Sequence, residues 1–498
     1  MESAIARLES ILFSPNPRRA GLARGSLYLA GAAAAALLVA VAGPIYALAL
    51  ALIILAALLI LRDMRWGFTA LLAVVALLPF ATLPFKLGFT PTFLDVALLS
   101  LFFVWIMRIA TRRQPALVGT GLGGAVLLFL ALLVLAFANG LRFGFPTVTT
   151  VRNVAELALA VLLFFLVVNT LRKEADLYFV AKVIMLGGAA AAAIAVVFYV
   201  IPQAWTVRIL DALGSFNYPG GYGALRFIED STDNPMRAIG TMVDPNVLGG
   251  FMILVAALTA PQLVSRQPLF HRAWIALFLA LEALALYLTY SRGSLVGLGV
   301  ALLVIGLLRY RRLLFVAVFA VALLLLLPPA QAYVAHFIEG VQLQDRATLM
   351  RLGEYRDAIG LIGRYPWLGV GFSGSPDADL YVGVSNLYLL IAEEMGVVGL
   401  AGFLLVVVVF LGSLWWAWRT LLSLGDGPTG APSNARLEAL LLGLGAAVTG
   451  VMVGGLLDHY LFNLVYPHMS VFFWLLLGLG MCAVILVRER AHPCPEIS

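Results

Sequence analysis

The stretch VVGLAGFLLVVVVFLGSLWWAWR, residues 397–419, decides the fold class of this chain. Its only charged side chain is Arg419, at its very end. An apolar run of this length crosses a hydrocarbon core of roughly 30 Å as an α-helix. Because lipid offers no hydrogen-bond partners, the backbone must satisfy its own polar groups, which also favours a helix. The stretch therefore predicts a membrane-spanning helix.

Similar runs recur along all 498 residues, of which 62% are hydrophobic and 12% charged, with a mean hydropathy of +1.01. This composition excludes an ordinary soluble domain. The short alternating segments of a membrane β-barrel are absent. We expect an all-α integral membrane protein, one polytopic domain over 1–498, with about 14 spans (12–14). The predicted limits are 26–43, 45–61, 67–84, 93–110, 122–139, 151–171, 177–201, 244–264, 272–291, 293–308, 312–329, 397–419, 437–457 and 465–487.

The arginines predict the orientation, because cytoplasmic loops carry an excess of basic residues. If the N-terminus is cytoplasmic, nearly every short basic connection lies on the cytoplasmic side, and an even number of spans returns the C-terminus there. Two long loops, 202–243 and 330–396, then face outward. Both carry arginines where the rule expects few. This exception indicates that the outer loops hold the functional site.

The longer outer loop precedes the opening stretch and contains Arg351, Glu354, Tyr355 and Arg356. Apolar residues at helical spacing around them predict an amphipathic helix on the bilayer surface, with arginines directed at phosphates. The alternative is a surface helix stabilised by local Arg–Glu pairs. Three glycines weaken the helix prediction; they are Gly353, Gly360 and Gly363.

The shorter outer loop ends in Arg237 and, after six residues, Asp244-Pro245-Asn246. Proline suits a first helical turn, and Asp244 can accept hydrogen bonds from its free amides. One interpretation is a helix cap with an incidental arginine. The other is an anion site at the membrane surface, with Arg237 as a fork-shaped donor.

Tyr290-Ser291-Arg292 joins two apolar runs with almost no loop, which places Arg292 at or just below the outer surface. A charge at that depth is costly unless paired or hydrated, so it suggests function; the alternative is an arginine that snorkels to the interface.

Asp458 and His459 lie in the last outer connection and offer further titratable groups, although a lone histidine is more often structural.

Several classes of function are disfavoured. No basic face interleaved with aromatics indicates nucleic-acid binding. No metal-ligand spacing and no Gly-x-Ser-x-Gly motif occurs, so we expect no metal and no serine acyl transfer. Outward arginines at membrane depth instead suit a di-anion anchored in lipid, such as a lipid-linked diphosphate.

Read together, four segments resemble the O-antigen ligase and polymerase superfamily. They are Arg237 to Asn246, Thr289 to Gly293, Arg351 to Gly371, and Asn386 followed after nine residues by Gly396-Val397-Val398-Gly399. The resemblance implies a GT-C-like scaffold in the bacterial inner membrane that transfers glycans at its periplasmic face without a cofactor. The implied partners are an undecaprenyl-diphosphate-linked glycan donor, a glycan acceptor, membrane lipids, a chain-length regulator and a flippase.

The resemblance also implies roles for residues. Arg237 and Arg292 would hold the donor diphosphate and stabilise the leaving group's charge, with Arg351 added to them. Such ligases usually carry histidine before the asparagine of Asn-x9-Gly-x-x-Gly, where this chain has Ser385. A serine is no general base near neutral pH, so Glu354, Glu393, Asp458 or His459 would take that role, or the chemistry differs. The expected substrate contacts are Asp244, Asn246, Tyr290, Ser291, Tyr355, Arg356, Ser385, Asn386 and Tyr388.

The serine favours a polymerase of O-antigen or exopolysaccharide repeats over a ligase that transfers glycan to lipid A-core or protein. A polysaccharide flippase is a further, non-enzymatic alternative. A transporter would show two similar halves and charges buried along a cavity. This chain has few mid-span charges, with Glu156 and Glu282 as the exceptions.

Overall fold

The computed structural model describes residues 60–84, 89–112, 116–325, 346–374, 383–424 and 434–492, with a few single residues outside these ranges. The predicted spans 26–43 and 45–61 lie outside the described residues, apart from a few positions, as does much of the long loop between 326 and 382. Contacts divide the chain into two units, Met1–Gly67 and Phe68–Ser498. The described end of the first unit contains an ion pair between Asp63 and Arg65.

The described chain is helical, and its only β pairings are two isolated bridges. The order of elements in the described residues is α4 (Met64–Leu77), α5 (Phe93–Ala110), α6 (Gly123–Gly140), α7 (Val148–Thr170), α8 (Glu174–Val200), α9 (Gln203–Ala212), the 3-10 turns η1 (Leu213–Phe216), η2 (Tyr222–Ala224), η3 (Ile228–Asp230) and η4 (Gly240–Met242), then α10 (Pro245–Val264), α11 (Arg272–Leu288), α12 (Arg292–Leu308), α13 (Arg311–Leu325), α15 (Arg346–Arg364), α16 (Leu387–Leu424), α17 (Ala435–Gly454) and α18 (Pro467–Ala491).

Eight described helices are long and apolar enough to cross a membrane: α5, α6, α7, α8, α10, α16, α17 and α18. This confirms the predicted class of multi-span helical protein, and the count of 14 stays a prediction. Helices α11, α12 and α13 coincide with predicted spans but, at 17, 17 and 15 described residues, are shorter than these eight helices. Helix α16 begins at Leu387, before the predicted span at 397.

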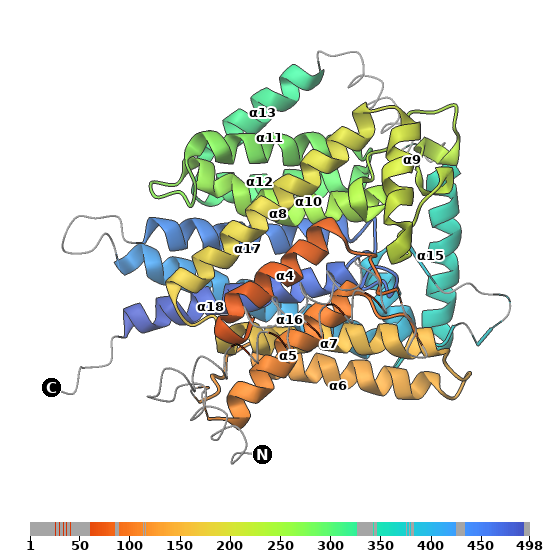
Figure 1. Ribbon diagram of the computed structural model, residues 1–498, viewed down its shortest axis with the longest axis horizontal. Helices are drawn as coiled ribbons and strands as arrows, with labels where there is room; N and C mark the ends of the chain where they lie inside the picture. Colours follow the sequence, from red (N-terminus) through yellow and green to blue (C-terminus); the bar gives the residue numbers. More distant parts are fainter. Residues whose placement is uncertain are drawn as a thin grey trace. The chain divides into compact units, whose positions relative to one another are not determined.

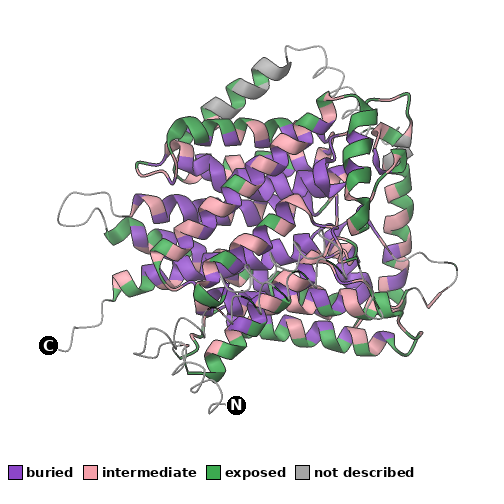
Figure 2. Cartoon of the chain, in the orientation of Figure 1, coloured by how far each residue is buried: buried purple, intermediate pink, exposed green. Residues whose placement is uncertain are grey.

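Helices α10, α17 and α18 form the centre of the second unit. In α18, 94% of the most apolar window is buried, compared with 33% in α5. Figure 2 shows the buried residues concentrated in the central helices. The outer helices carry exposed apolar side chains such as Leu99 and Phe103. An exposed apolar face on a helix of this length suits contact with lipid.

Small residues let the central helices approach closely. A Cβ built on Gly297 of α12 would lie 2.7 Å from the Gly450 carbonyl oxygen of α17, and one on Gly450 would lie 2.6 Å from the Gly297 carbonyl oxygen. Close backbone contact of this kind is typical of helix pairs in membranes. It fixes α12, and therefore Arg292 at its start, against the core of the unit.

The two mid-span glutamates have structural partners. Arg152 of α7 donates to Glu156 at 2.8 Å and to Asp95 of α5 at 2.9 Å. Glu282 of α11 accepts a hydrogen bond from Thr259 of α10 at 3.2 Å. Glu156 is thus paired with an arginine, as buried charges usually are, whereas Glu282 has a hydroxyl partner. Neither contact indicates the charged transport cavity that a flippase would require.

In the second unit, helix α15 runs across the ends of the long helices such as α6, α7 and α16 (Figure 1). It is the predicted amphipathic helix of the long loop, and it includes Gly353, Gly360 and Gly363. Ala358 and Leu361 are fully buried against the protein, whereas Leu352 and Ile359 are exposed. Two faces of the helix are therefore apolar, one for the protein and one that suits the bilayer surface.

Candidate active site

Three arginines from separate parts of the chain line one pocket. Arg237 comes from the segment before η4, Arg292 from the first position of α12 and Arg351 from α15. The pocket has a volume of about 70 Å³, and the remaining lining residues are Ile228, Glu229, Asn246, Tyr290, Ser291, Gly293 and Leu457. The structure thus brings together the three arginines that the sequence singled out, with three of the expected substrate contacts.

Arg237 is held in a fixed orientation. Its Nε donates to the Thr289 carbonyl oxygen at 2.7 Å, and its Nη2 donates to Asn246 Oδ1 at 2.6 Å. The main chain next to it is tied to the end of α11, because the Ala238 amide donates to the Leu288 carbonyl at 2.8 Å. A planar guanidinium fork suits this two-sided arrangement, and a lysine could not reproduce it.

The helix-cap interpretation of Asp244 is confirmed. Asp244 Oδ1 accepts from the amides of Asn246 at 2.8 Å and Val247 at 3.0 Å, with Pro245 as the first residue of α10. The cap also serves the pocket, since it fixes Asn246, which in turn holds Arg237. Asp244 itself does not line the pocket, and its Oδ2 accepts from the Tyr466 hydroxyl at 3.4 Å.

The turn before α12 presents Arg292. Tyr290 has a left-handed backbone with φ 52°, and Ser291 caps α12 by accepting from the Ser294 amide. A left-handed aromatic residue is uncommon and costs about 1–3 kcal/mol. The strained turn places Tyr290, Ser291 and Arg292 side by side in the pocket wall.

Glu229 is the pocket residue that sequence reasoning missed. It lies in η3, where its backbone is left-handed with φ 56°. Glu229 is exposed and lines the same pocket as the three arginines. The residue sits in an irregular stretch without a recognisable motif, so the only available signal was its place in the shorter outer loop.

Glu354, Tyr355, Ser385 and Asn386 form a second, structural group beside the pocket. Glu354 Oε2 accepts from the Ser385 amide at 2.9 Å, and the Tyr355 hydroxyl donates to the Leu456 carbonyl at 3.1 Å. Asn386 Nδ2 donates to the same carbonyl at 2.8 Å. These bonds join α15, the start of α16 and the end of α17.

Asn386 also begins α16, because its Oδ1 accepts from the amides of Tyr388 and Leu389, both at 3.0 Å. The Tyr388 hydroxyl donates to the Met452 carbonyl at 2.7 Å. Their contacts are with the main chain, and neither residue lines the pocket. Arg356 is exposed and does not line it either.

The glycine-rich stretch after α15 docks on a break in α16. Gly396 interrupts the helix with φ 70° and ψ 179°. The amides of Val370 and Gly371 donate to the carbonyls of Glu393 and Glu394 at 2.8 and 2.9 Å, and the Val397 amide donates to the Pro366 carbonyl at 2.8 Å. The two glycine motifs of the family resemblance are thus the two sides of one backbone junction.

Asp458 and His459 lie near the arginine pocket rather than in it. Asp458 Oδ1 accepts from the His459 amide at 2.8 Å, and the His459 Nδ1 lies 3.7 Å from the same oxygen. Burial raises the pKa of the Asp458 carboxyl above its ordinary value, although the charges of His459 and Arg351 oppose this rise. Leu457, which precedes this pair, does line the pocket.

The described residues contain no group of three histidine, cysteine or carboxylate side chains placed to hold a metal ion. What the pocket offers is concentrated positive charge. Guanidinium groups bind phosphate oxygens with paired, charge-assisted hydrogen bonds. The arrangement can therefore hold a phosphate-bearing ligand and stabilise negative charge that develops on it.

A model of the family described as O-Antigen ligase matches residues 275–404. The match confirms the predicted relationship to the O-antigen ligase and polymerase superfamily. The matched range includes Arg292, Arg351 and the Asn386 motif, whereas Arg237 precedes it. The apolar helices and the family together indicate a multi-pass membrane protein with ligase or polymerase activity. A comparison with curated proteins found no match.

Proposed function

We propose that this member of the O-antigen ligase and polymerase superfamily polymerises glycan repeats carried on undecaprenyl diphosphate, at the periplasmic face of the inner membrane. The observation that carries this proposal is the convergence of Arg237, Arg292 and Arg351 on one pocket. A lipid-linked diphosphate is a di-anion at membrane depth, and this is the ligand that such a pocket suits.

In the proposed reaction, a hydroxyl oxygen of the acceptor sugar attacks the anomeric carbon of the donor glycan. The bond between that carbon and the diphosphate oxygen breaks, and the diphosphate leaves with the electron pair. The arginines neutralise the charge that grows on the leaving group, which is electrostatic stabilisation of the transition state. The acceptor proton passes to a protein base.

We assign the base to a carboxylate at the pocket, with Glu229 and Asp458 as the two candidates. Glu229 lines the pocket, whereas Asp458 is buried beside it with a raised pKa. A raised pKa brings a carboxyl closer to the value that suits proton transfer near neutral pH. Glu354 does not line the pocket, and its Oε2 accepts from the Ser385 amide.

The polymerase proposal is tested by profiling glycans in a strain that lacks the protein. Single repeats on the lipid carrier or the cell surface are the expected result. Full-length polymer stranded on the carrier would instead indicate a ligase. Repeats retained on the inner leaflet would indicate a flippase.

Complementation of that strain tests the role of the pocket. We expect Arg292→Ala to insert in the membrane at the wild-type level and to form no polymer. Polymer of normal length and yield from this variant would refute the catalytic role of Arg292.

A further inference from the structure

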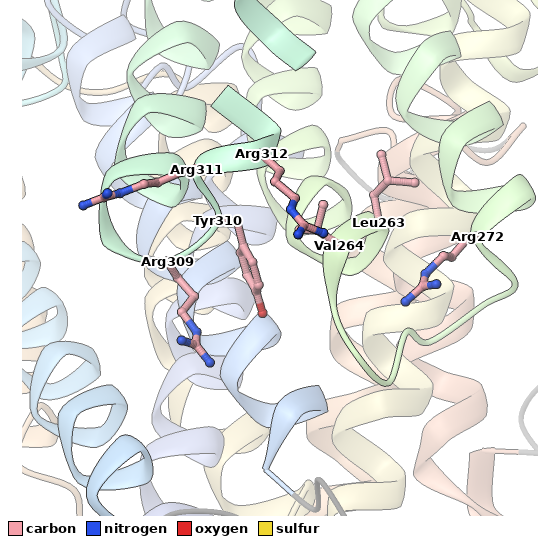
Figure 3. A pocket seen from close by; sticks show the side chains of 7 residues that line it. All are labelled: Leu263, Val264, Arg272, Arg309, Tyr310, Arg311 and Arg312. Carbon is pink, nitrogen blue, oxygen red and sulfur yellow. The ribbon is translucent and has the colours of Figure 1, made fainter. Parts of the chain in front are cut away.

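A second pocket lined by arginines lies far from the first. It has a volume of about 580 Å³, and its lining residues are Leu263, Val264, Arg272, Arg309, Tyr310, Arg311 and Arg312 (Figure 3). They come from the end of α10, the start of α11, the end of α12 and the start of α13. Four guanidinium groups on one cavity form a strongly positive site.

The two pockets lie at opposite ends of the same helices. Asn246 and Arg292, at the starts of α10 and α12, line the first pocket. The ends of these helices contribute Val264 and Arg309 to the second. Helix α10 has 20 residues and is therefore about 30 Å long, which matches the hydrocarbon core of a bilayer. The second pocket therefore lies at headgroup level in the opposite leaflet.

The local contacts leave much of this positive charge uncompensated. Arg309 Nε lies 2.7 Å from Glu438 Oε1 of α17, and Arg272 Nη2 donates to the Ser265 carbonyl at 3.1 Å. Arg311 and Arg312 form no ion pair or side-chain hydrogen bond within the described part of the chain. Within the described part of the chain, these four arginines thus have one glutamate as an ion-pair partner.

Tyr310 adds a neutral donor. Its hydroxyl has no hydrogen-bond partner among the described residues, and burial raises its pKa to about 12, so the phenol keeps its proton. In Figure 3 the Arg309 guanidinium and the Tyr310 hydroxyl point the same way, and the Arg272 side chain faces them from α11. Arginines combined with a hydroxyl donor are typical of sites for phosphate oxygens.

We propose that this pocket binds the phosphate of an anionic phospholipid of the cytoplasmic leaflet. A cavity of this size accommodates a phosphate with its glycerol group. Basic pockets between transmembrane helices on the cytoplasmic side recognise such headgroups. The proposal is independent of the reaction at the other end of the helices.

The test uses the purified full chain with added phosphatidylglycerol, phosphatidylcholine or inorganic phosphate. Phosphatidylglycerol should raise the thermal unfolding midpoint of the wild type, and phosphatidylcholine should not. The Arg311→Gln/Arg312→Gln variant should lose on the order of tenfold or more in apparent affinity for phosphatidylglycerol. The matched control, Arg419→Gln/Arg488→Gln, removes two exposed charges from α16 and α18 and should respond like the wild type.

Equal stabilisation by both lipids, or an equal response of the two double variants, would overturn the proposal. If inorganic phosphate stabilised the wild type and phosphatidylglycerol did not, the pocket would bind phosphate but not a phospholipid headgroup. That result would overturn the proposed lipid. If the double variant does not fold, Tyr310→Phe replaces it. That variant keeps every charge, and it should still weaken the response to phosphatidylglycerol.

Discussion

A Cβ atom built on Gly396 would lie 2.1 Å from the carbonyl oxygen of Trp367. Trp367 follows the end of α15, and Gly396 lies at the interruption of α16, where the two backbones are in contact. On the facing side, a Cβ on Gly369 would lie 2.3 Å from the Glu393 carbonyl oxygen. Both junction glycines also have positive φ, 70° and 64°. No other residue type fits at either position.

Gly396→Ala should therefore destabilise the protein by about 3 kcal/mol, since strain at such backbone angles costs about 1–3 kcal/mol before any clash is counted. The free energy of unfolding in detergent measures this. The matched control is Gly353→Ala in the interior of α15, where an added Cβ meets open space. That change should stabilise the helix by about 1 kcal/mol. If the two variants were equally stable, glycine would not be required at position 396 for the junction.

Arg351 and Arg356 lie on the same helix, and only Arg351 lines the pocket. Arg351→Gln should reduce polymer synthesis about 10- to 100-fold, because a charge-assisted hydrogen bond contributes about 1.5–3 kcal/mol. Arg356→Gln removes the same charge from an exposed position and should leave the rate within about twofold of the wild type. The measurement is incorporation of lipid-linked repeats by purified protein. If both variants lost the same activity, the loss would follow from the lower positive charge of the helix and not from a contact in the pocket.

Ser385 makes its described contacts through its backbone. Ser385→Ala should therefore retain most polymer synthesis, because the hydroxyl is not required for the amide's bond to Glu354. Glu354→Ala removes the acceptor and should cost about 1–2 kcal/mol of stability. Turnover and unfolding are measured on both variants. Complete loss of turnover in folded Ser385→Ala would show that the hydroxyl takes part in the chemistry.

Asp458 should make stability depend on pH. Burial raises the pKa of its carboxyl in the folded state, so the unfolded chain ionises first as pH rises. The contribution of Asp458 to the free energy of unfolding is fully present below the pKa of its carboxyl in the unfolded chain, about 4. It is lost as pH rises through the higher pKa of the folded state. Asp458→Asn keeps an oxygen acceptor for the His459 amide and should remove this component. The unfolding midpoint is compared across pH in both proteins, and parallel profiles would refute the assignment.

Much of the site could be predicted because its chemistry is local in sequence. Arg237, Arg292 and Arg351 stand out as charges in positions that the sequence predicts to face outward at membrane level, and Asp244-Pro245 has the sequence of a helix start. Their convergence was implied by the family resemblance, and physical reasoning on each segment alone could not give it. Glu229 could not be identified from the sequence, because its position depends on a left-handed turn in an irregular loop.

The glycine motifs show a different limit. Gly369 and Gly396 are conspicuous in the sequence, but nothing in either segment indicates that they face each other. The junction is made by backbone atoms of chain segments more than twenty residues apart, so it leaves no mark in hydrophobic periodicity or charge. Helix α16 starts before the predicted span because a first helical segment, residues 387–395, precedes the break at Gly396.

Helices α10 and α12 each contribute residues to a pocket at both ends. If both pockets function as proposed, a change in the length of either helix would also change the relative rotation of its two ends. Each residue of an α-helix turns the chain by about 100°. One inserted residue in the middle of α12 would leave Arg292 in the first pocket but swing Arg309 about a quarter turn away from the second. Length variation should therefore be tolerated outside these helices, and within them only in steps that restore the rotational phase of both ends.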